Sequence, residues 1–280
     1  MADIRKVNPI YLVAMYAVVI LFAILTVYPV LWVIMSSFKT TQEYMLHSKL
    51  AFPVKLYFRN YPIAWRDANF TVLIVNSIFY TGISLISVVI LSFMAGFAFA
   101  KLPSKLTYVL HGSFIIGILI TIQCIMVPLF IMIRGAGLIN TRLGVLVSYI
   151  GLGLPLGVYL ATEYIKAIPN EVIESARLDG AVYLRIFSTI IMPMAVPVAT
   201  TVAILTFSSF WNEFMLINIL VSSDGLKSIP VGMNMFSGSL ATDYGKQFAA
   251  LVIGLAPMMV FYALFKNQIT KGVVAGAVKG

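Results

Sequence analysis

Charged residues are scarce in this sequence. Only 10% of its 280 residues are Asp, Glu, Lys or Arg, whereas 61% are hydrophobic and the mean hydropathy is +0.99. Soluble domains carry roughly 25% charged residues, so this chain cannot cover a water-facing surface of ordinary size. The composition therefore excludes an ordinary soluble enzyme, an intrinsically disordered chain and a secreted disulfide scaffold.

Groups that could carry chemistry are also rare. The single cysteine, Cys124, excludes an internal disulfide and a cysteine-based metal site. His47 and His111 are separated by a long apolar stretch, and no Gly-x4-Gly-Lys-Ser/Thr phosphate loop occurs. We therefore expect no catalytic residue, no metal site and no cofactor in this chain, and the protein is not expected to be an enzyme. The 19 basic residues are scattered among short connections, which argues against a nucleic-acid partner.

What the sequence has in abundance is long apolar runs. A membrane-spanning helix needs about 20 mostly apolar residues, and six uncharged stretches come near or exceed this length. They are residues 7–38, 68–100, 106–133, 143–162, 186–212 and 247–265. None shows the alternation of a membrane β-strand. The sequence thus predicts an all-α integral membrane protein with six transmembrane helices, the first retained, and both termini on one side.

Two of these stretches carry small residues at informative positions. Gly96 and Ala100 form a small-xxx-small pair, which lets two helices approach closely. The fourth stretch contains Gly151, Gly153, Pro155 and Gly157, so we expect its backbone hydrogen bonding to be interrupted. Such a break indicates either a helix that lines a pathway or a packing kink. The basic residues divide ten against nine between the two sides, so the positive-inside rule does not orient the chain.

The densest charge cluster lies between the fourth and fifth stretches, over residues 163–187. Pro169 and Asn170 are typical of a helix start, and Gly180 is suited to end the helix with a positive φ. The helix between them is too short to be stable alone. It therefore either fits a groove, in this protein or in another, or lies along the membrane interface.

This segment resembles a known motif. Glu174-Ser175-Ala176, then Gly180, then Ile190 and Met192-Pro193 keep the spacing of the EAA loop found in permease subunits of bacterial ABC importers. Other stretches are similar to the carbohydrate-importing branch, and in particular to the maltose-type six-helix permease. They are Tyr28-Pro29, residues 36–40, Asn76-Ser77, residues 211–214 and the tail from Gly272 to Gly280.

The resemblance implies a type I ABC importer permease fold, with residues 1–280 forming one transmembrane domain in the bacterial cell membrane. It implies that residues 163–187 form a cytoplasmic coupling-helix loop, so that both termini are cytoplasmic. The implied ATPase-coupling residues are Glu174, Ser175, Ala176, Asp179, Gly180 and Pro193. A cytoplasmic tail over 270–280 would contact the ATPase through Gly276, Val278, Lys279 and Gly280. Residues 221–246 would form a mobile extracytoplasmic loop that reaches the binding protein.

The implied function is that of half of an ATP-driven import pathway for a sugar or oligosaccharide. Its partners would be a second related permease in a heterodimer, a dimeric cytoplasmic ATP-binding subunit that holds ATP–Mg, an extracytoplasmic solute-binding protein, the carbohydrate and membrane lipid. The alternatives are an ABC importer of a polyol, glycerol-phosphate or amino acid, or an ion-coupled secondary transporter. The last would need ionisable residues at mid-span, and the six stretches carry essentially none.

A few polar residues near the membrane are candidates for the substrate pathway: Asn76, Trp211, Asn212 and Glu213. An aromatic side chain beside amides and acids suits a sugar. Equally, Trp211 and Glu213 suit an anchor at the membrane interface, and Asn76 suits a hydrogen bond to a neighbouring helix.

Overall fold

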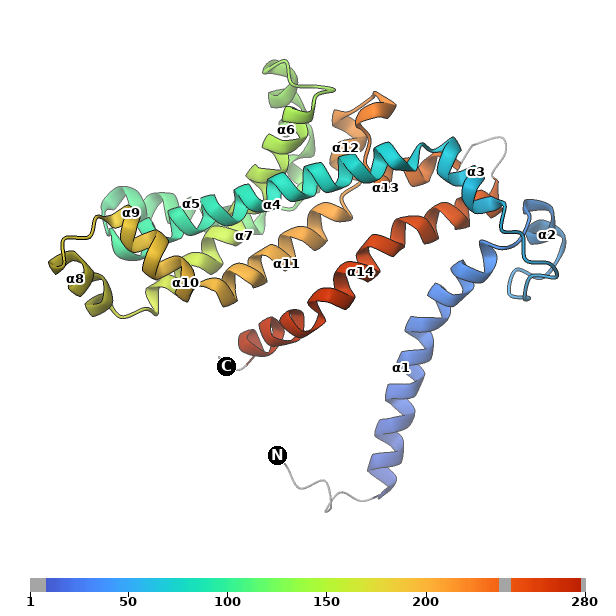
Figure 1. The fold of residues 1–280 in the computed structure, drawn as a ribbon, viewed down its shortest axis with the longest axis horizontal. Coiled ribbons are helices and arrows are strands. Elements are labelled where there is room, and N and C mark those ends of the chain that lie inside the picture. The colour runs from blue at the N-terminus through green and yellow to red at the C-terminus, as the bar shows by residue number, and fades with distance from the viewer. Residues whose placement is uncertain (1–8, 237–242, 278–280) are drawn as a thin grey trace. The chain divides into compact units, whose positions relative to one another are not determined.

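All secondary structure in the described residues of the computed structural model, 9–236 and 243–277, is helical. The helices are labelled in Figure 1. The chain divides into two compact units. Unit 1 comprises residues up to 69 together with 233–256, and unit 2 comprises 70–232 together with the residues from 257 onward. The last helix, α14 (Tyr244–Ala277), contributes to both units.

Unit 1 is built from α1 (Pro9–Ser36), α2 (Thr41–Leu46), α3 (Asn60–Asp67) and the first half of α14. The apolar stretch of α1 is 27 residues long, which is enough to cross a membrane, and its most apolar window has no buried residue. Aromatic side chains connect α1 and α2 to α14, because Trp32 of α1 lies edge-on to Phe248 at 5.2 Å and Tyr44 of α2 lies 4.8 Å from Tyr244.

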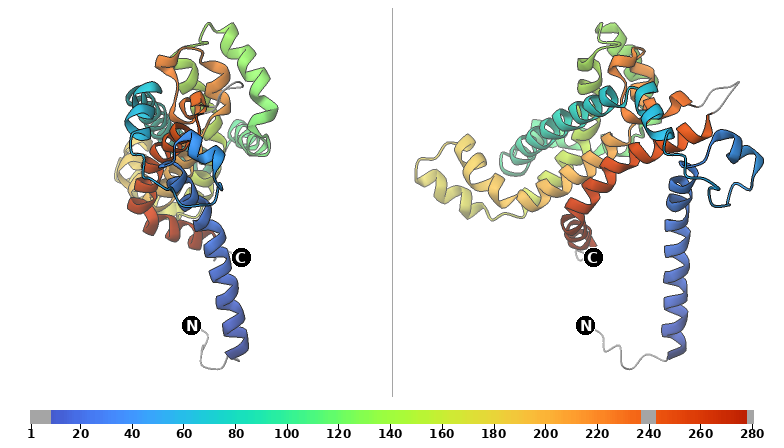
Figure 2. Two further views of the ribbon diagram at one scale, coloured as in Figure 1. Left: turned by 90° about the vertical axis from the view of Figure 1, so that its right-hand side faces the viewer. Right: turned by 45° about the vertical axis from the view of Figure 1, so that its right-hand side comes forward.

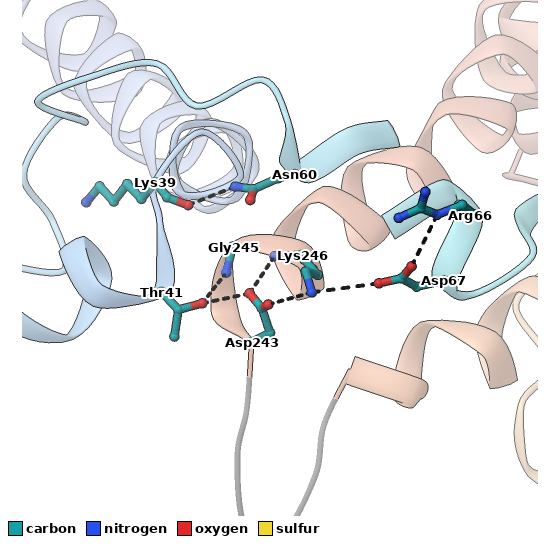
Figure 3. Close-up of polar contacts among 8 residues, drawn as sticks. All are labelled: Lys39, Thr41, Asn60, Arg66, Asp67, Asp243, Gly245 and Lys246. Atoms are coloured by element: carbon teal, nitrogen blue, oxygen red, sulfur yellow. Dashed lines mark hydrogen bonds and ion pairs between the residues drawn. The ribbon is translucent and has the colours of Figure 1, made fainter. Parts of the chain in front are cut away.

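A polar cluster fixes the start of α14 within unit 1 (Figure 3). The Thr41 hydroxyl donates to the Asp243 carboxylate at 2.7 Å, and Lys246 pairs with Asp243 at 3.0 Å and with Asp67 at 3.7 Å. Burial alone would raise the pKa of the Asp243 carboxyl, but hydrogen bonds from Thr41 and Lys246 together lower that pKa below its ordinary value. Gly245 has no room for a side chain, because an added Cβ would lie 2.6 Å from the Lys39 carbonyl oxygen.

Unit 2 is organised around three long helices that lie side by side: α4 (Phe70–Lys101), α7 (Arg142–Lys166) and α11 (Val196–Trp211) (Figure 1). The closest packing is between α4 and α7, and the buried apolar core of the unit lies along these helices. Figure 1 and the right-hand view of Figure 2 show that α8 (Asn170–Leu178) and α9 (Tyr183–Ile186) lie at one end of unit 2.

Small residues make the close approach of α4 and α7 possible. A Cβ on Gly96 of α4 would lie 2.8 Å from the Ala161 Cβ of α7, and one on Gly153 of α7 would lie 2.7 Å from a methyl of Val88. A Cβ on Gly157 would collide with the Ser92 hydroxyl. Gly153 and Gly157 of the fourth stretch therefore serve packing, as small residues do where helices meet in lipid.

The predicted interruption of the fourth stretch is wrong. Helix α7 runs for 25 residues without a break and contains Pro155. A proline removes one backbone hydrogen bond from a helix, and Gly153 and Gly157 on either side of Pro155 lie tightly against α4.

Four described helices are long and apolar enough to span a membrane: α1, α4, α7 and α14. The third and fifth predicted spans are instead bent helix pairs, so the described chain has six spans if each pair is counted as one. The third predicted span consists of α5 (Lys105–Leu119) and α6 (Ile122–Gly135), and it bends by 114° where Ile120 and Thr121 are extended. The fifth bends by 77° at Ala195, between Pro193 and Pro197.

Short elements complete the described part of the molecule. They are a π-helix over Phe187–Ile191, α10 (Met192–Met194), α12 (Met215–Leu220), a 3-10 turn over Asp224–Leu226, α13 (Ile229–Met233) and a 3-10 turn over Asn234–Phe236. The predicted loop over 221–246 is therefore a set of short helices in its described part, and Ile229 and Val231 in it are buried. Residues 237–242 of that loop lie outside the described residues.

Candidate functional site

The segment that carries the EAA-like motif forms a separate short helix, α8, as predicted. Asn170 is its first residue, after the extended Pro169. The chain leaves the helix through Gly180, whose φ of +80° confirms the predicted positive-φ terminus. Backbone N–H groups of Gly180 and Ala181 donate to the carbonyls of Arg177 and Ala176, each at 3.0 Å, which satisfies the end of the helix.

The two faces of α8 differ sharply. Ile173 and Ala176 are buried and belong to the apolar core of unit 2. Glu174 and Ser175 are exposed, and the Leu178 side chain is 90% exposed. Leu178 therefore contributes little to the apolar packing of unit 2.

The predicted ATPase-coupling residues are only partly brought together. Glu174, Ser175 and Ala176 lie in α8, and Asp179 and Gly180 follow it directly. Pro193 lies in α10, beside the bend at Ala195, and is not part of α8.

A hollow of about 750 Å³ lies between α8 and the end of α4. It is lined by Ala100, Lys101, Pro103, Asn170, Ile173, Glu174, Arg177, Leu178 and Tyr183. The Lys101 ammonium donates to the Ile168 carbonyl at 2.6 Å and to the Asn170 side-chain oxygen at 2.8 Å. Sequence reasoning missed Lys101, although its place as the last residue of a long apolar helix was visible.

Only part of the predicted C-terminal contact segment lies within the described residues. Helix α14 extends to Ala277 and so includes Gly276. Val278, Lys279 and Gly280 lie outside the described residues.

A second cavity, of about 440 Å³, lies among α7, α11 and the break between α5 and α6. Asn212 and Glu213 line it, together with Tyr149, Thr206 and Ser209. The Tyr149 ring stacks on Phe210 at a centroid distance of 4.6 Å. The sequence predicted Asn212 and Glu213 as pathway residues because they are polar residues at the end of the fifth apolar stretch. It did not predict Tyr149, Thr206 and Ser209, because single Tyr, Thr and Ser residues are common in spans.

The Glu213 carboxylate has three hydrogen-bond donors. It accepts from the Tyr149 hydroxyl at 3.2 Å and from the backbone N–H groups of Leu216 and Ile217 at 2.7 and 3.2 Å. It therefore caps the first turn of α12, where a negative charge is stabilised by the helix dipole. This bonding fixes the wall of the cavity next to Asn212.

Asn76 and Trp211 do not line this cavity. Asn76 is 1% exposed, and its amide donates to the carbonyls of Gly225 and Lys227 at 2.9 and 3.0 Å. Trp211 is 6% exposed and stacks on Phe207. In this structure Asn76 holds the 3-10 turn against α4. This is close to the alternative given above, a hydrogen bond to a neighbouring helix, although here the acceptors lie in and next to a short turn.

No group of three or more His, Cys, Asp or Glu side chains within 9–236 and 243–277 could hold a metal ion. The polar groups of the two cavities are amides, hydroxyls, two carboxylates (the exposed Glu174 and the capped Glu213) and the cations of Lys101 and Arg177. Such groups can bind a neutral polar molecule or a protein surface by hydrogen bonding.

Comparison with known proteins agrees with this geometry. Residues 88–272 match the family described as the binding-protein-dependent transport system inner membrane component. The chain is 32% identical to the diacetylchitobiose uptake system permease protein of Streptomyces coelicolor, over 93% of this chain and 87% of that protein. It is also 32% identical to the trehalose transport system permease protein of Mycobacterium tuberculosis, over 90% and 92% of the two chains.

The fold matches a solved structure as well. A chain of a bacterial ABC transporter involved in the import of the acidic polysaccharide alginate superposes with a TM-score of 0.84. The match covers 95% of this chain and 99% of the other at 20% sequence identity, so it shows a shared fold. The predicted all-α fold of an ABC importer permease is thereby confirmed. Since the family match covers most of the chain, the protein is a multi-pass membrane component of the binding-protein-dependent transport system family.

Proposed function

We propose that this chain is the permease subunit of an ATP-driven importer of a sugar or oligosaccharide. The relatives support the substrate class, because their names refer to diacetylchitobiose, trehalose, and melibiose, raffinose and stachyose. They are 30–32% identical to this chain over 88% or more of its length. As an importer permease, it works with other ABC subunits and a substrate-binding protein.

The observation that carries the coupling part of the proposal is the two-sided character of α8. One face, with Ile173 and Ala176, is fixed in the core of unit 2, and the other presents Glu174, Ser175 and the exposed Leu178. A helix anchored in this way can be displaced by a partner that binds its free face, and it can transmit this displacement to the membrane helices. We infer that a cytoplasmic ATPase dimer, which binds ATP–Mg, covers this free face.

The orientation follows from this docking. An ATPase partner in the cytoplasm places α8 there, and with six spans both termini are cytoplasmic. The tail residues Gly276, Val278, Lys279 and Gly280 then lie on the same side as the ATPase and can contact it.

A second related permease completes the pathway in this proposal. The absence of buried residues from the most apolar window of α1 leaves that helix available for lipid or for the partner permease. The cavity that contains Asn212 and Glu213 would form part of the sugar path, with the Tyr149–Phe210 pair as an aromatic wall.

Uptake by reconstituted vesicles tests the function. Proteoliposomes containing this chain, the partner permease and the ATPase should take up a labelled oligosaccharide only under two conditions. ATP must be present on the cytoplasmic side of the membrane, and the binding protein must be present on the other side. An uncoupler alone should leave uptake intact, since no ion gradient drives it. Uptake that persists without the ATPase and stops with the uncoupler would instead indicate a secondary transporter.

A further inference from the structure

The last turn of α4 holds α8 at both of its ends. At the entry, the Lys101 ammonium bridges the Ile168 carbonyl at 2.6 Å and the Asn170 side-chain oxygen at 2.8 Å. Ile168 and Asn170 flank Pro169, where the chain turns from α7 into α8. Both bonds are made by a charged donor, and such bonds are roughly twice as strong as neutral ones.

The exit of α8 is held by a cation–π contact and by contacts between tilted aromatic rings. The Arg177 guanidinium lies 4.6 Å from the centroid of the Tyr183 ring in α9. Tyr183 in turn lies 6.4 Å from Phe97, one turn before Lys101 in α4, and Phe97 also lies 5.8 Å from Phe187. Phe97 is buried, so this contact is anchored in the core of unit 2.

These contacts connect α8 to α4 in addition to the chain connection from α7 through residues 167–169. Without the Lys101 bridge, the entry of α8 would depend on residues 167–169, which belong to no helix. A nine-residue helix has little stability of its own. Helix α4 is the element that packs most extensively on α7 through Gly96, Gly153 and Gly157.

We propose that Lys101 is a positioning residue that locks α8 onto α4, so that displacement of α8 is transmitted to the α4–α7 pair. The inference rests on the proposed function only for the cause of the displacement of α8, which is the ATPase. The locking itself depends on no partner. Lys101 does not need to touch either the sugar or the nucleotide.

Hydrogen exchange in the full chain in lipid nanodiscs tests the lock. In Lys101→Met the amides of α8 should exchange at least about tenfold faster than in the wild type, because the brace against local opening is lost. The amides of α7 should be unchanged, and Lys101→Arg should restore slow exchange. Lys105→Met is the matched control, because Lys105 is an exposed lysine four residues further on. Unchanged exchange of α8 in Lys101→Met would overturn the proposal.

A second readout tests transmission in the assembled transporter. Lys101→Met should lower the amount of sugar transported per ATP hydrolysed by about tenfold, with the ATPase subunit still bound. A purely structural role would lower sugar uptake and ATP hydrolysis together, so that the amount of sugar transported per ATP hydrolysed would stay constant. That result would also overturn the proposal. If Lys101→Met does not fold, Asn170→Ala removes one acceptor alone and should shift both readouts in the same direction. If wild-type vesicles show no ATP-dependent uptake, the proposed function fails, and the exchange result alone then decides whether Lys101 locks α8.

Discussion

Three glycines at the α4–α7 contact show how single residues set the distance between helices. Gly96, Gly153 and Gly157 each stand where a Cβ would meet a neighbouring atom closer than ordinary contact allows. Gly151, on the same helix as two of them, has open space around its Cβ position. The same residue type thus has different consequences at neighbouring positions.

Gly96→Val should therefore destabilise the protein, whereas Gly151→Ala should not. Overpacking a close contact costs about 1–3 kcal/mol, and the obstruction at Gly96 includes the Thr162 backbone nitrogen at 2.9 Å, which cannot turn away. Thermal unfolding of the detergent-purified variants measures this difference. Equal stability of Gly96→Val and Gly151→Ala would contradict the close packing of α4 and α7.

Gly180 acts through its backbone conformation. Its φ is +80°, and nothing lies within 4 Å of its Cβ position, so a side chain would be strained but not blocked. The left-handed conformation costs roughly 1–2 kcal/mol for other residues. We expect Gly180→Val to abolish uptake while the protein still inserts, and Gly180→Asn, which tolerates this conformation better, to retain much of it. Vesicle uptake normalised to inserted protein measures both, and normal uptake by Gly180→Val would refute the role of this turn.

Asp243 gives unit 1 a dependence on pH. Because hydrogen bonds from Thr41 and Lys246 lower the pKa of this carboxyl in the folded protein, its ionised form stabilises unit 1 above the ordinary carboxyl pKa. That contribution is lost as the pH falls through the folded-state value. Thermal unfolding between pH 7 and pH 3 should show a steeper loss in the wild type than in Asp243→Asn. Parallel curves for the two proteins would argue against this contribution.

At the scale of whole elements, the apolar stretches predicted where the spans lie but not how they bend. The stretch 106–133 is uncharged throughout, and only the extended Ile120 and Thr121 divide it. Residues of these types are common in straight spans, so the sequence gives no signal for a bend there. The fifth stretch carried such a signal in Pro193 and Pro197, which flank the bend at Ala195.

The opposite error occurred in the fourth stretch. Gly151, Gly153, Pro155 and Gly157 favoured a break when read locally, yet α7 is continuous, and Gly153 and Gly157 are packed against α4. That contact joins Gly153 to Val88, 65 positions away in the sequence, and cannot be read from a local pattern. By contrast, the ends of α8 depend on local turn chemistry, and the sequence predicted them correctly.

The free face of α8 leads to a prediction for this element. Leu178→Asp should abolish binding of the ATPase without destabilising the permease, because Leu178 is 90% exposed and contributes little to the core. Leu178→Met is the control, since it retains an apolar side chain of similar size. Co-purification with the ATPase measures the effect. Retention of the ATPase by Leu178→Asp would mean that this face is not the docking surface.

At the scale of the whole molecule, the described chain consists of two compact units that share α14. Unit 1 holds the apolar helix α1 and the polar cluster around Asp243, and unit 2 holds α8 and both cavities. The sequence predicted one transmembrane domain over residues 1–280, and this division stays a prediction. The structural match to a chain of the alginate transporter covers 95% of this chain. That Tyr149 meets Asn212 in one cavity could not be predicted, since Tyr149 lies in α7 and Asn212 directly follows α11.

The central claim is that α8 is the point at which an ATPase acts on this permease. Site-specific cross-linking from residue 175 tests it most directly, with Ser175→Cys in a Cys124→Ser background to remove the native thiol. In membranes that contain the assembled importer, the account predicts a cross-link to the ATP-binding subunit and no labelling of residue 175 by an impermeant thiol reagent added outside the cell. Labelling from outside, or cross-links that never include the ATP-binding subunit, would contradict it.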